Sequence, residues 1–156
     1  MTITCNCKTN VMRIATLIIV FLLSATAYAQ DMSAGFTLLE TGKYEEAKAF
    51  FGEVLEDYPD NKTARLCYGR ALGLSGDSAE ARSLFTTLKA DYPTDFEVGL
   101  NYAESLLWDS DFGAAKDFYE TLVAKDSTSF SALLGYANTL SNLKEYDAAI
   151  TYVNKA

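Results

Sequence analysis

A period of 34 residues runs through this chain from about residue 31 to its last residue. Alanine recurs at this spacing in Ala47, Ala81, Ala115 and Ala149. Leucine recurs in Leu38, Leu72, Leu106 and Leu140, and a large apolar residue recurs in Phe51, Phe85, Tyr119 and Val153. A fixed period near 34 residues is typical of stacked helix–turn–helix units. The period therefore predicts a helical repeat array and leaves its ligand open.

The second period has the pattern of two helices joined by a tight turn. Its apolar residues form the stripe of an amphipathic helix, at spacings of i, i+4, i+7 and i+8: Ala64, Tyr68, Ala71 and Leu72. Gly76 is expected to end this helix, because glycine readily takes the left-handed conformation found there. Asp77 is expected to cap a second helix in a capping box with Glu80. Pro93 ends that helix, because proline disfavours helical geometry in the residue before it.

The same pattern predicts four units of about 34 residues. Their approximate ranges are 30–61, 62–95, 96–129 and 130–156, of which the last is incomplete. The third and fourth units are expected to form helices over 96–108, 112–124, 130–142 and from 146 onward. Ser110 stands where the second unit has its turn glycine. No polar capping helix follows the fourth unit, and this predicts that the chain is a fragment of a longer protein.

Several residues of the second unit resemble the tetratricopeptide repeat. They are, in order, Tyr68-Gly69, Leu72, Gly76-Asp77, Ala81, Phe85 and Pro93. The resemblance implies an all-α, right-handed α-solenoid of antiparallel helix pairs, in which the first helix of each pair lines a concave groove. It also implies a non-enzymatic scaffold that binds a protein or peptide in that groove.

Residues 1–29 have the pattern of a secretory signal peptide. Arg13 precedes an apolar run over 14–24, and Ala27-Tyr28-Ala29 forms a cleavage site of small residues. Cleavage is expected after Ala29, and Met12 is the expected start. An uncleaved membrane helix is the alternative, but the run is shorter than the ~20 apolar residues that span a bilayer. The pattern predicts an exported bacterial protein, periplasmic or secreted, whose repeat domain occupies 30–156.

The charge balance restricts the partners of the predicted repeat domain. Residues 30–156 contain 21 acidic and 11 basic residues, a net charge of −10. This charge repels nucleic acid and anionic lipid. We therefore expect no nucleic-acid partner, and membrane association only through a further domain. A cationic partner is compatible with the charge, and an acidic solvated surface is the alternative.

The residue types give little support for chemistry. The chain has no His, which removes the usual general base and the commonest metal ligand. We therefore predict no enzyme activity, cofactor or metal within these residues. The acidic pair Asp109 and Asp111 is interpreted as helix caps and solvated charge. Cys67, the one thiol after residue 29, is interpreted as a buried packing residue.

The candidate binding residues are those on the first helices that the packing stripe does not use. They are Arg70, Asn101, Glu104, Trp108 and Asn138. Arg70, Glu104 and Asn138 occupy one repeat position and yet differ in chemistry, which is typical of ligand-specific positions. A surface salt bridge between Arg70 and Glu104 is the alternative. Trp108 is predicted either to contact the ligand or to pack on the next unit, and Trp108→Ala is predicted to weaken binding.

Two other functions fit the same repeats. The stretch 102–109 is similar to repeats in the periplasmic arms of outer-membrane β-barrels and polysaccharide-export proteins. The repeats could also be the targeting module of an enzyme or sensor whose catalytic domain lies downstream. The sequence beyond residue 156 would distinguish these alternatives from a stand-alone scaffold.

Overall fold

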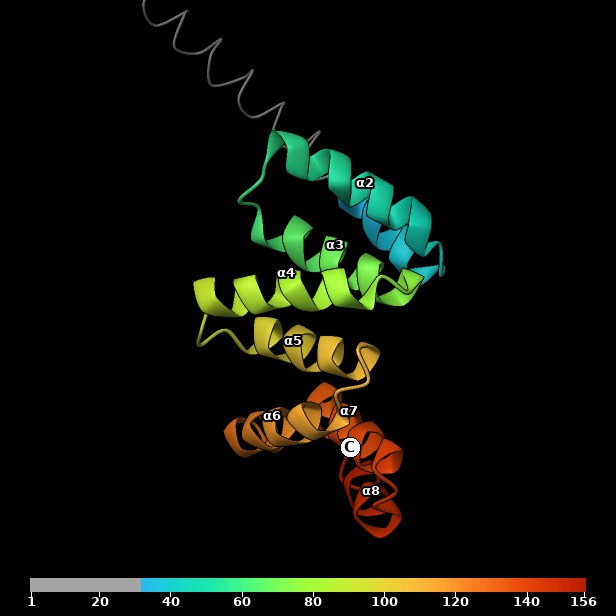
Figure 1. Cartoon of the computed structure of the whole chain (residues 1–156), viewed down its shortest axis with the longest axis vertical. Helices are drawn as coiled ribbons and strands as arrows, with labels where there is room; N and C mark the ends of the chain where they lie inside the picture. The colour runs from blue at the N-terminus through green and yellow to red at the C-terminus, as the bar shows by residue number, and fades with distance from the viewer. Residues whose placement is uncertain (1–31) are drawn as a thin grey trace, which may run out of the picture.

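The computed structural model describes residues 32–156, and within them every regular element is a helix. A helix over 32–40 is followed by α2 (Tyr44–Asp57), α3 (Lys62–Ser75), α4 (Ser78–Asp91), α5 (Phe96–Trp108), α6 (Phe112–Lys125), α7 (Phe130–Asn142) and α8 (Tyr146–Val153). The helices stack along the long axis in chain order (Figure 1). The prediction of an all-α solenoid of helix pairs is therefore confirmed. The predicted signal peptide and its cleavage site lie outside the described residues.

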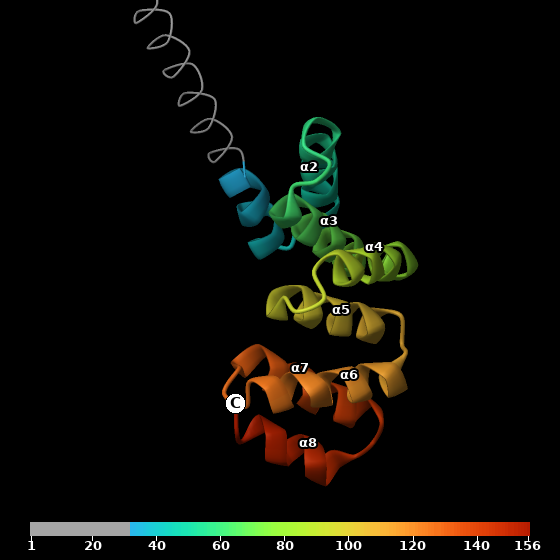
Figure 2. The ribbon, with the colours of Figure 1, turned by 90° about the vertical axis from the view of Figure 1, so that its left-hand side faces the viewer.

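The helix pairs are arranged so that the first helices form an inner layer. Each helix from α2 to α8 packs on the next helix along the chain. In addition α3 contacts α5, and α5 contacts α7, whereas α4, α6 and α8 have no such contacts with one another. The stacking of these pairs can be followed in Figure 2. None of the helices in 32–156 has the length and hydropathy needed to cross a membrane.

Residues that keep the 34-residue period form the centre of each helix pair. Phe51 and Phe85 have no exposed surface, and the repeated alanines Ala47, Ala81 and Ala115 are also fully buried. The Phe85 ring lies directly against Gly69, where a β-carbon would overlap it. Small residues on one helix thus allow close backbone approach, and an aromatic ring from the other fills the remaining space. The predicted packing role of these positions is confirmed.

The turns inside the helix pairs all use the left-handed backbone conformation. Gly42 and Gly76 have φ of 76° and 102°, and Ser110 and Lys144 have φ of 60° and 66°. The expectation for Gly76 is confirmed, and Ser110 adopts the same conformation in place of glycine. A residue with a β-carbon pays about 1–2 kcal/mol in this conformation. The two later turns are therefore locally strained.

Ser110→Gly is expected to raise the free energy of unfolding by about 1 kcal/mol. Glycine removes the steric cost at φ 60°, and this gain exceeds the added entropy of the unfolded chain. Urea denaturation followed by circular dichroism measures the change. Ser83→Gly is the matched control, because Ser83 is exposed inside α4 and glycine there should destabilise by about 0.5 kcal/mol through its lower helix propensity. A loss of stability in Ser110→Gly would contradict the assignment of strain.

The helix starts are mostly capped by side chains as the sequence patterns suggest. Asn61 accepts a hydrogen bond from the backbone N–H of Ala64 at 2.9 Å, and Asp111 accepts one from Ala114 at 3.2 Å. The prediction for Asp77 is wrong in this respect. Asp77 occupies the N-cap position of α4 but makes no capping hydrogen bond. Its carboxylate instead accepts a hydrogen bond from Lys48 Nζ at 2.7 Å, which draws it away from the helix start.

An ion-pair ladder, defined here by three repeated pairs, joins successive units on the outside of the solenoid. The pairs are Lys48–Asp77, Arg82–Asp111 and Lys116–Glu145, with N–O distances of 2.7, 2.9 and 2.6 Å. Both the basic and the acidic positions recur every 34 residues. Arg82 also forms an ion pair with Asp109, so both carboxylates of the acidic pair, Asp109 and Asp111, bind the same guanidinium group. Each pair is partly exposed and screened by solvent, so it contributes little to stability.

Candidate binding groove

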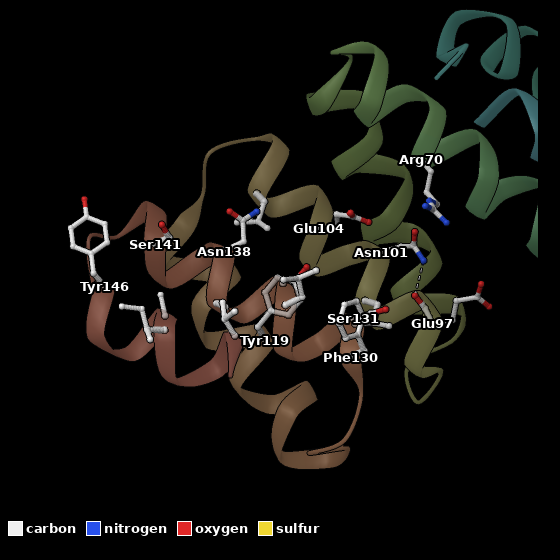
Figure 3. A pocket seen from close by; sticks show the side chains of 18 residues that line it. Arg70, Glu97, Asn101, Glu104, Tyr119, Phe130, Ser131, Asn138, Ser141 and Tyr146 are labelled. Carbon is white, nitrogen blue, oxygen red and sulfur yellow. Dashed lines mark hydrogen bonds between the residues drawn. The ribbon is translucent and has the colours of Figure 1, made fainter. Parts of the chain in front are cut away.

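One cavity of about 940 Å³ opens on the inner layer near the C-terminal half of the described chain. We call it the groove cavity. Its lining comes from five helices, α3, α5, α6, α7 and α8, and Figure 3 shows it from close by. The lining residues are Arg70, Glu97, Leu100, Asn101, Glu104, Leu107, Tyr119, Phe130, Ser131, Leu134, Gly135, Ala137, Asn138, Ser141, Tyr146, Ala149, Ile150 and Val153. The cavity is large enough to hold several side chains of a ligand.

The structure brings four of the five candidate residues to this cavity. Arg70 comes from α3, Asn101 and Glu104 come from α5, and Asn138 comes from α7. The 34-residue period places Arg70, Glu104 and Asn138 on three neighbouring first helices, so their side chains face the same groove (Figure 3). The alternative salt bridge is not formed, because no ion pair joins Arg70 to Glu104 in the described part of the chain.

Glu104 lies in a partly desolvated position inside the groove cavity. Burial raises the pKa of its carboxyl group above the ordinary value, and the charge of Arg70 opposes this shift only in part. A raised carboxyl pKa means that the folded state disfavours the ionised form. The charged Glu104 therefore costs stability at neutral pH, and this cost disappears as the pH falls through its raised pKa. Such a carboxylate gains most from a ligand that supplies positive charge.

Two side chains that are more than nine-tenths buried direct polar atoms into the same cavity. Tyr119 is 3% exposed and Asn101 is 7% exposed. The Asn101 Nδ2 atom donates to the Glu97 carbonyl at 2.8 Å, but its Oδ1 atom has no partner within 32–156. The Tyr119 hydroxyl has no partner there either. Every described polar side-chain atom that is sealed from solvent has a partner, so these two atoms keep some contact with solvent, and both residues line the cavity.

Trp108, the fifth candidate, does not line the groove cavity. Its six-membered ring lies directly over Gly73, and its ring centroid is 6.3 Å from that of Phe85. The structure thus favours the packing alternative for Trp108. The contact is made with the preceding unit, whereas the sequence suggested the next one. Gly73 explains why Trp108 packs on the preceding unit, because a residue without a side chain leaves room on α3 for the indole ring.

An apolar wall on α7 and α8 borders the cavity, and its α8 side chains were missed from the sequence. It consists of five large side chains that are 45–61% exposed: Phe130, Leu134, Tyr146, Ile150 and Val153. Clustered exposed apolar residues mark interaction sites. The 34-residue period contained one sign of this wall. Ile150 occupies the repeat position of Lys48, and Val153 occupies that of Phe51. The ion-pair ladder accordingly ends before Ile150.

Tyr119 was also missed, because the candidates were sought only on first helices. Its equivalents Phe51 and Phe85 are fully buried, and the hydroxyl is what distinguishes Tyr119 from these two phenylalanines. Tyr119 reaches the cavity because Gly135 on α7 has no side chain: a β-carbon at Gly135 would overlap the phenol ring. Burial, with the nearby Glu104 charge, raises the pKa of Tyr119, so its hydroxyl stays protonated at neutral pH.

Cys67 behaves as a packing residue. Its side chain is buried beside Phe51 and Ala71, and burial raises the pKa of the thiol to about 11. A thiol of this pKa is a poor nucleophile at neutral pH. Among residues 32–156, no group of His, Cys, Asp and Glu side chains could hold a metal ion. The arrangement is suited to binding through hydrogen bonds, charge and apolar contact.

Antiparallel helix pairs with first helices around a groove define a helical repeat scaffold, and family comparisons specify its kind. Two models described as the tetratricopeptide repeat match residues 38–104 and 130–156, which together form more than half of the chain. The chain therefore belongs to the tetratricopeptide-repeat family. No curated protein matches it.

Solved structures show the same fold at low sequence identity. MamA of Desulfovibrio magneticus RS-1, from residue 41 to its end, superposes with a TM-score of 0.64 at 17% identity, over 78% of this chain and 68% of that one. A double mutant of MamA RS-1 superposes with a TM-score of 0.62 at 20% identity, over 80% of this chain and 70% of that one. A chain of the APC/C hetero-tetramer Cut9–Hcn1 superposes with a TM-score of 0.64 at 18% identity, over 80% of this chain and 24% of that one.

Proposed function

We propose that this protein is a non-enzymatic scaffold that holds a peptide segment of a partner protein in the groove cavity. One observation carries the proposal: Asn101 and Tyr119 are largely buried side chains, and each keeps a polar atom that has no partner within 32–156 and is open to a cavity that also exposes a large apolar wall. Burying a polar group without a partner costs free energy unless water or a ligand satisfies it. A peptide offers both the hydrogen bonds and the apolar side chains that this surface can use.

Membership of the tetratricopeptide-repeat family supports the proposal that the chain binds a protein partner. Tetratricopeptide repeats bind protein partners, and one of the similar structures is a hetero-tetramer, Cut9–Hcn1. The groove cavity contains residues from several units, so its shape depends on the stacking of the repeats. A scaffold of this kind binds through a preformed surface and needs little ordering of its own. The free energy of binding then comes mainly from desolvation of the apolar wall and from hydrogen bonds at its polar side.

Leu134→Asp is expected to weaken peptide binding by at least about 10-fold, since a charge in the centre of the apolar wall must be desolvated on binding. Peptides are first selected from a displayed random library against the whole chain, and their affinities are then measured by isothermal titration calorimetry. Leu134 is 45% exposed, so the folded state should tolerate the substitution.

Thr87→Asp is the control for this test, because Thr87 is exposed on α4 and lies outside the groove cavity. It introduces the same charge and should leave the affinities unchanged. If the library gives no binders, or if Leu134→Asp binds the selected peptides as well as the wild type does, the groove cavity is not the binding site and the proposal fails.

We further propose that residues 30–156 act in the cell envelope. The signal-peptide pattern of residues 1–29 supports this location. Expression of the tagged chain in a bacterium, followed by fractionation and mass spectrometry of its N-terminus, tests it. A mature N-terminus at Gln30 in the exported fraction is expected, and an uncleaved cytoplasmic chain would exclude the proposal.

A further inference from the structure

We infer that the groove cavity recognises a basic side chain, Lys or Arg, flanked by apolar residues of the bound segment, with Glu104 as the charge partner. This inference rests on the proposed peptide-binding function and specifies the chemistry of its ligand.

The charges around the cavity favour a cation. Three side chains with formal charges line it, Arg70, Glu97 and Glu104, and their sum is −1. One basic side chain of a ligand brings this sum to zero. Arg70 does not already neutralise Glu104, because within the described residues it forms no ion pair with any carboxylate. The excess of acidic residues over the rest of the chain adds a long-range attraction for the same kind of ligand.

The polar atoms at the cavity are arranged for a group with several donors. The Glu104 carboxylate and the Asn101 Oδ1 atom accept hydrogen bonds, and the Tyr119 oxygen can accept one as well. Glu104 and Tyr119 both line the cavity, and the Glu104 charge adds to the raised pKa of Tyr119. A lysine ammonium has three donors and no acceptor, and a guanidinium has five donors. Either group would satisfy atoms that the protein itself leaves without a partner.

The apolar wall suits the remainder of such a ligand. Lysine and arginine side chains bury their methylene stems against apolar surface while the charged end reaches a polar group. Leu100 and Leu134 line the cavity on the same two helices as Glu104 and Asn138. Phe130 and Ile150 are exposed farther along the wall and can contact the apolar residues that flank the basic one. The expected motif is therefore one basic residue within a short apolar segment.

The test uses the peptides selected from the displayed random library against the whole chain. Peptides whose binding depends on Leu134 are expected to be enriched in one Lys or Arg. For a selected peptide, changing its basic residue to Gln should weaken binding to the wild type by about 10-fold or more. The protein variant Glu104→Gln should bind the original peptide more weakly than the wild type does, by a similar factor. The double change should cost little more than either single change, because both remove the same interaction.

Two further variants separate recognition from folding. Glu120→Gln removes the same charge from an exposed position on α6 outside the cavity, and it should leave binding unchanged. Tyr119→Phe removes the hydroxyl and keeps the ring, so it should weaken binding several-fold without loss of stability. Glu104→Gln should be at least as stable as the wild type at neutral pH, since it removes a desolvated charge. A purely structural role for Glu104 would instead lower stability and affect all peptides equally.

Acid should weaken the interaction in the same way. Protonation of Glu104 removes its charge, and its raised pKa places this loss above the ordinary carboxyl range. The other ionisable side chains that face the cavity are Arg70 on α3, Glu97 on α5, Tyr119 on α6 and Tyr146 on α8. Glu104→Gln should therefore remove most of the acid-dependent loss of affinity. An unchanged pH profile in this variant would count against the inference.

The outcomes distinguish this inference from the proposed function. If the selected peptides depend on Leu134 but lack a basic residue, or if Glu104→Gln retains full affinity for a Lys peptide, the inference is overturned and peptide binding stands. Enrichment of Asp and Glu in the peptides would assign recognition to Arg70 instead and also overturn it. If no peptide depends on Leu134, both proposals fail together.

Discussion

Phe85→Ala is expected to lower the free energy of unfolding by about 3–5 kcal/mol, the range for removing a fully buried aromatic ring. Phe85 has no exposed surface and packs against Gly69 and, at a centroid distance of 6.3 Å, against Trp108. The ring therefore joins the second unit to the third. A cavity here should loosen both units, because each repeat of a solenoid is stabilised mainly by its neighbours. Urea denaturation followed by circular dichroism measures the loss.

Phe130→Ala is the matched control, because it deletes the same side chain from a position that is 61% exposed. Its stability should change by no more than about 0.5 kcal/mol, as for most surface substitutions. Equal effects of the two substitutions would show that Phe85 is not part of the core that joins these units.

The second large effect concerns the contact of Gly73 with Trp108. Trp108→Ala is expected to cost about 3 kcal/mol, the lower end of the range for deleting a packed Trp, because the indole is only partly buried. Gly73→Ala is expected to cost about 1–3 kcal/mol despite the higher helix propensity of Ala, since its β-carbon would overlap the indole ring. Both values are measurable by urea denaturation.

The two substitutions should couple strongly. In the Trp108→Ala background the ring is absent, so Gly73→Ala should stabilise the protein by about 0.8–1 kcal/mol through helix propensity alone. The sign of the Gly73→Ala effect thus reverses between the two backgrounds. An effect of the same sign and size in both would exclude the contact. This cycle also separates packing from recognition, since a binding defect in Trp108→Ala is expected to follow its loss of stability.

Much of the fold could be predicted from the sequence because the information is local and periodic. The helix ends at Gly76 and Pro93 depend on backbone preferences that a single residue carries. The buried positions Ala81 and Phe85 recur every 34 residues, so each repeat supports the interpretation of the next. The ion-pair ladder follows the same spacing, but each of its pairs joins a second helix to a turn of the next unit, and a sequence does not show which helix and turn meet.

The groove cavity could be predicted only in part. Arg70, Glu104 and Asn138 were identified because one repeat position with varied chemistry stands out from a regular pattern. Tyr119 and the α8 part of the apolar wall, Tyr146, Ile150 and Val153, were missed because they lie on second helices, which were assigned to packing. Trp108 was ambiguous because its environment depends on Gly73, 35 positions earlier in the chain. Each of these features depends on a contact between units, which a residue's own repeat position does not specify.

The sequence by itself determined the helix boundaries, the repeated core and the acidic character of this protein, because backbone preference, amphipathic spacing and net charge are properties of the residues and their order. The tertiary structure decided which largely buried side chains keep a polar atom open to the groove. Asn101 and Tyr119 are polar residues in helices like many others until neighbouring units enclose them around one cavity. Only packing between units removes water from some of their atoms and leaves others facing the groove, and this difference defines the candidate site.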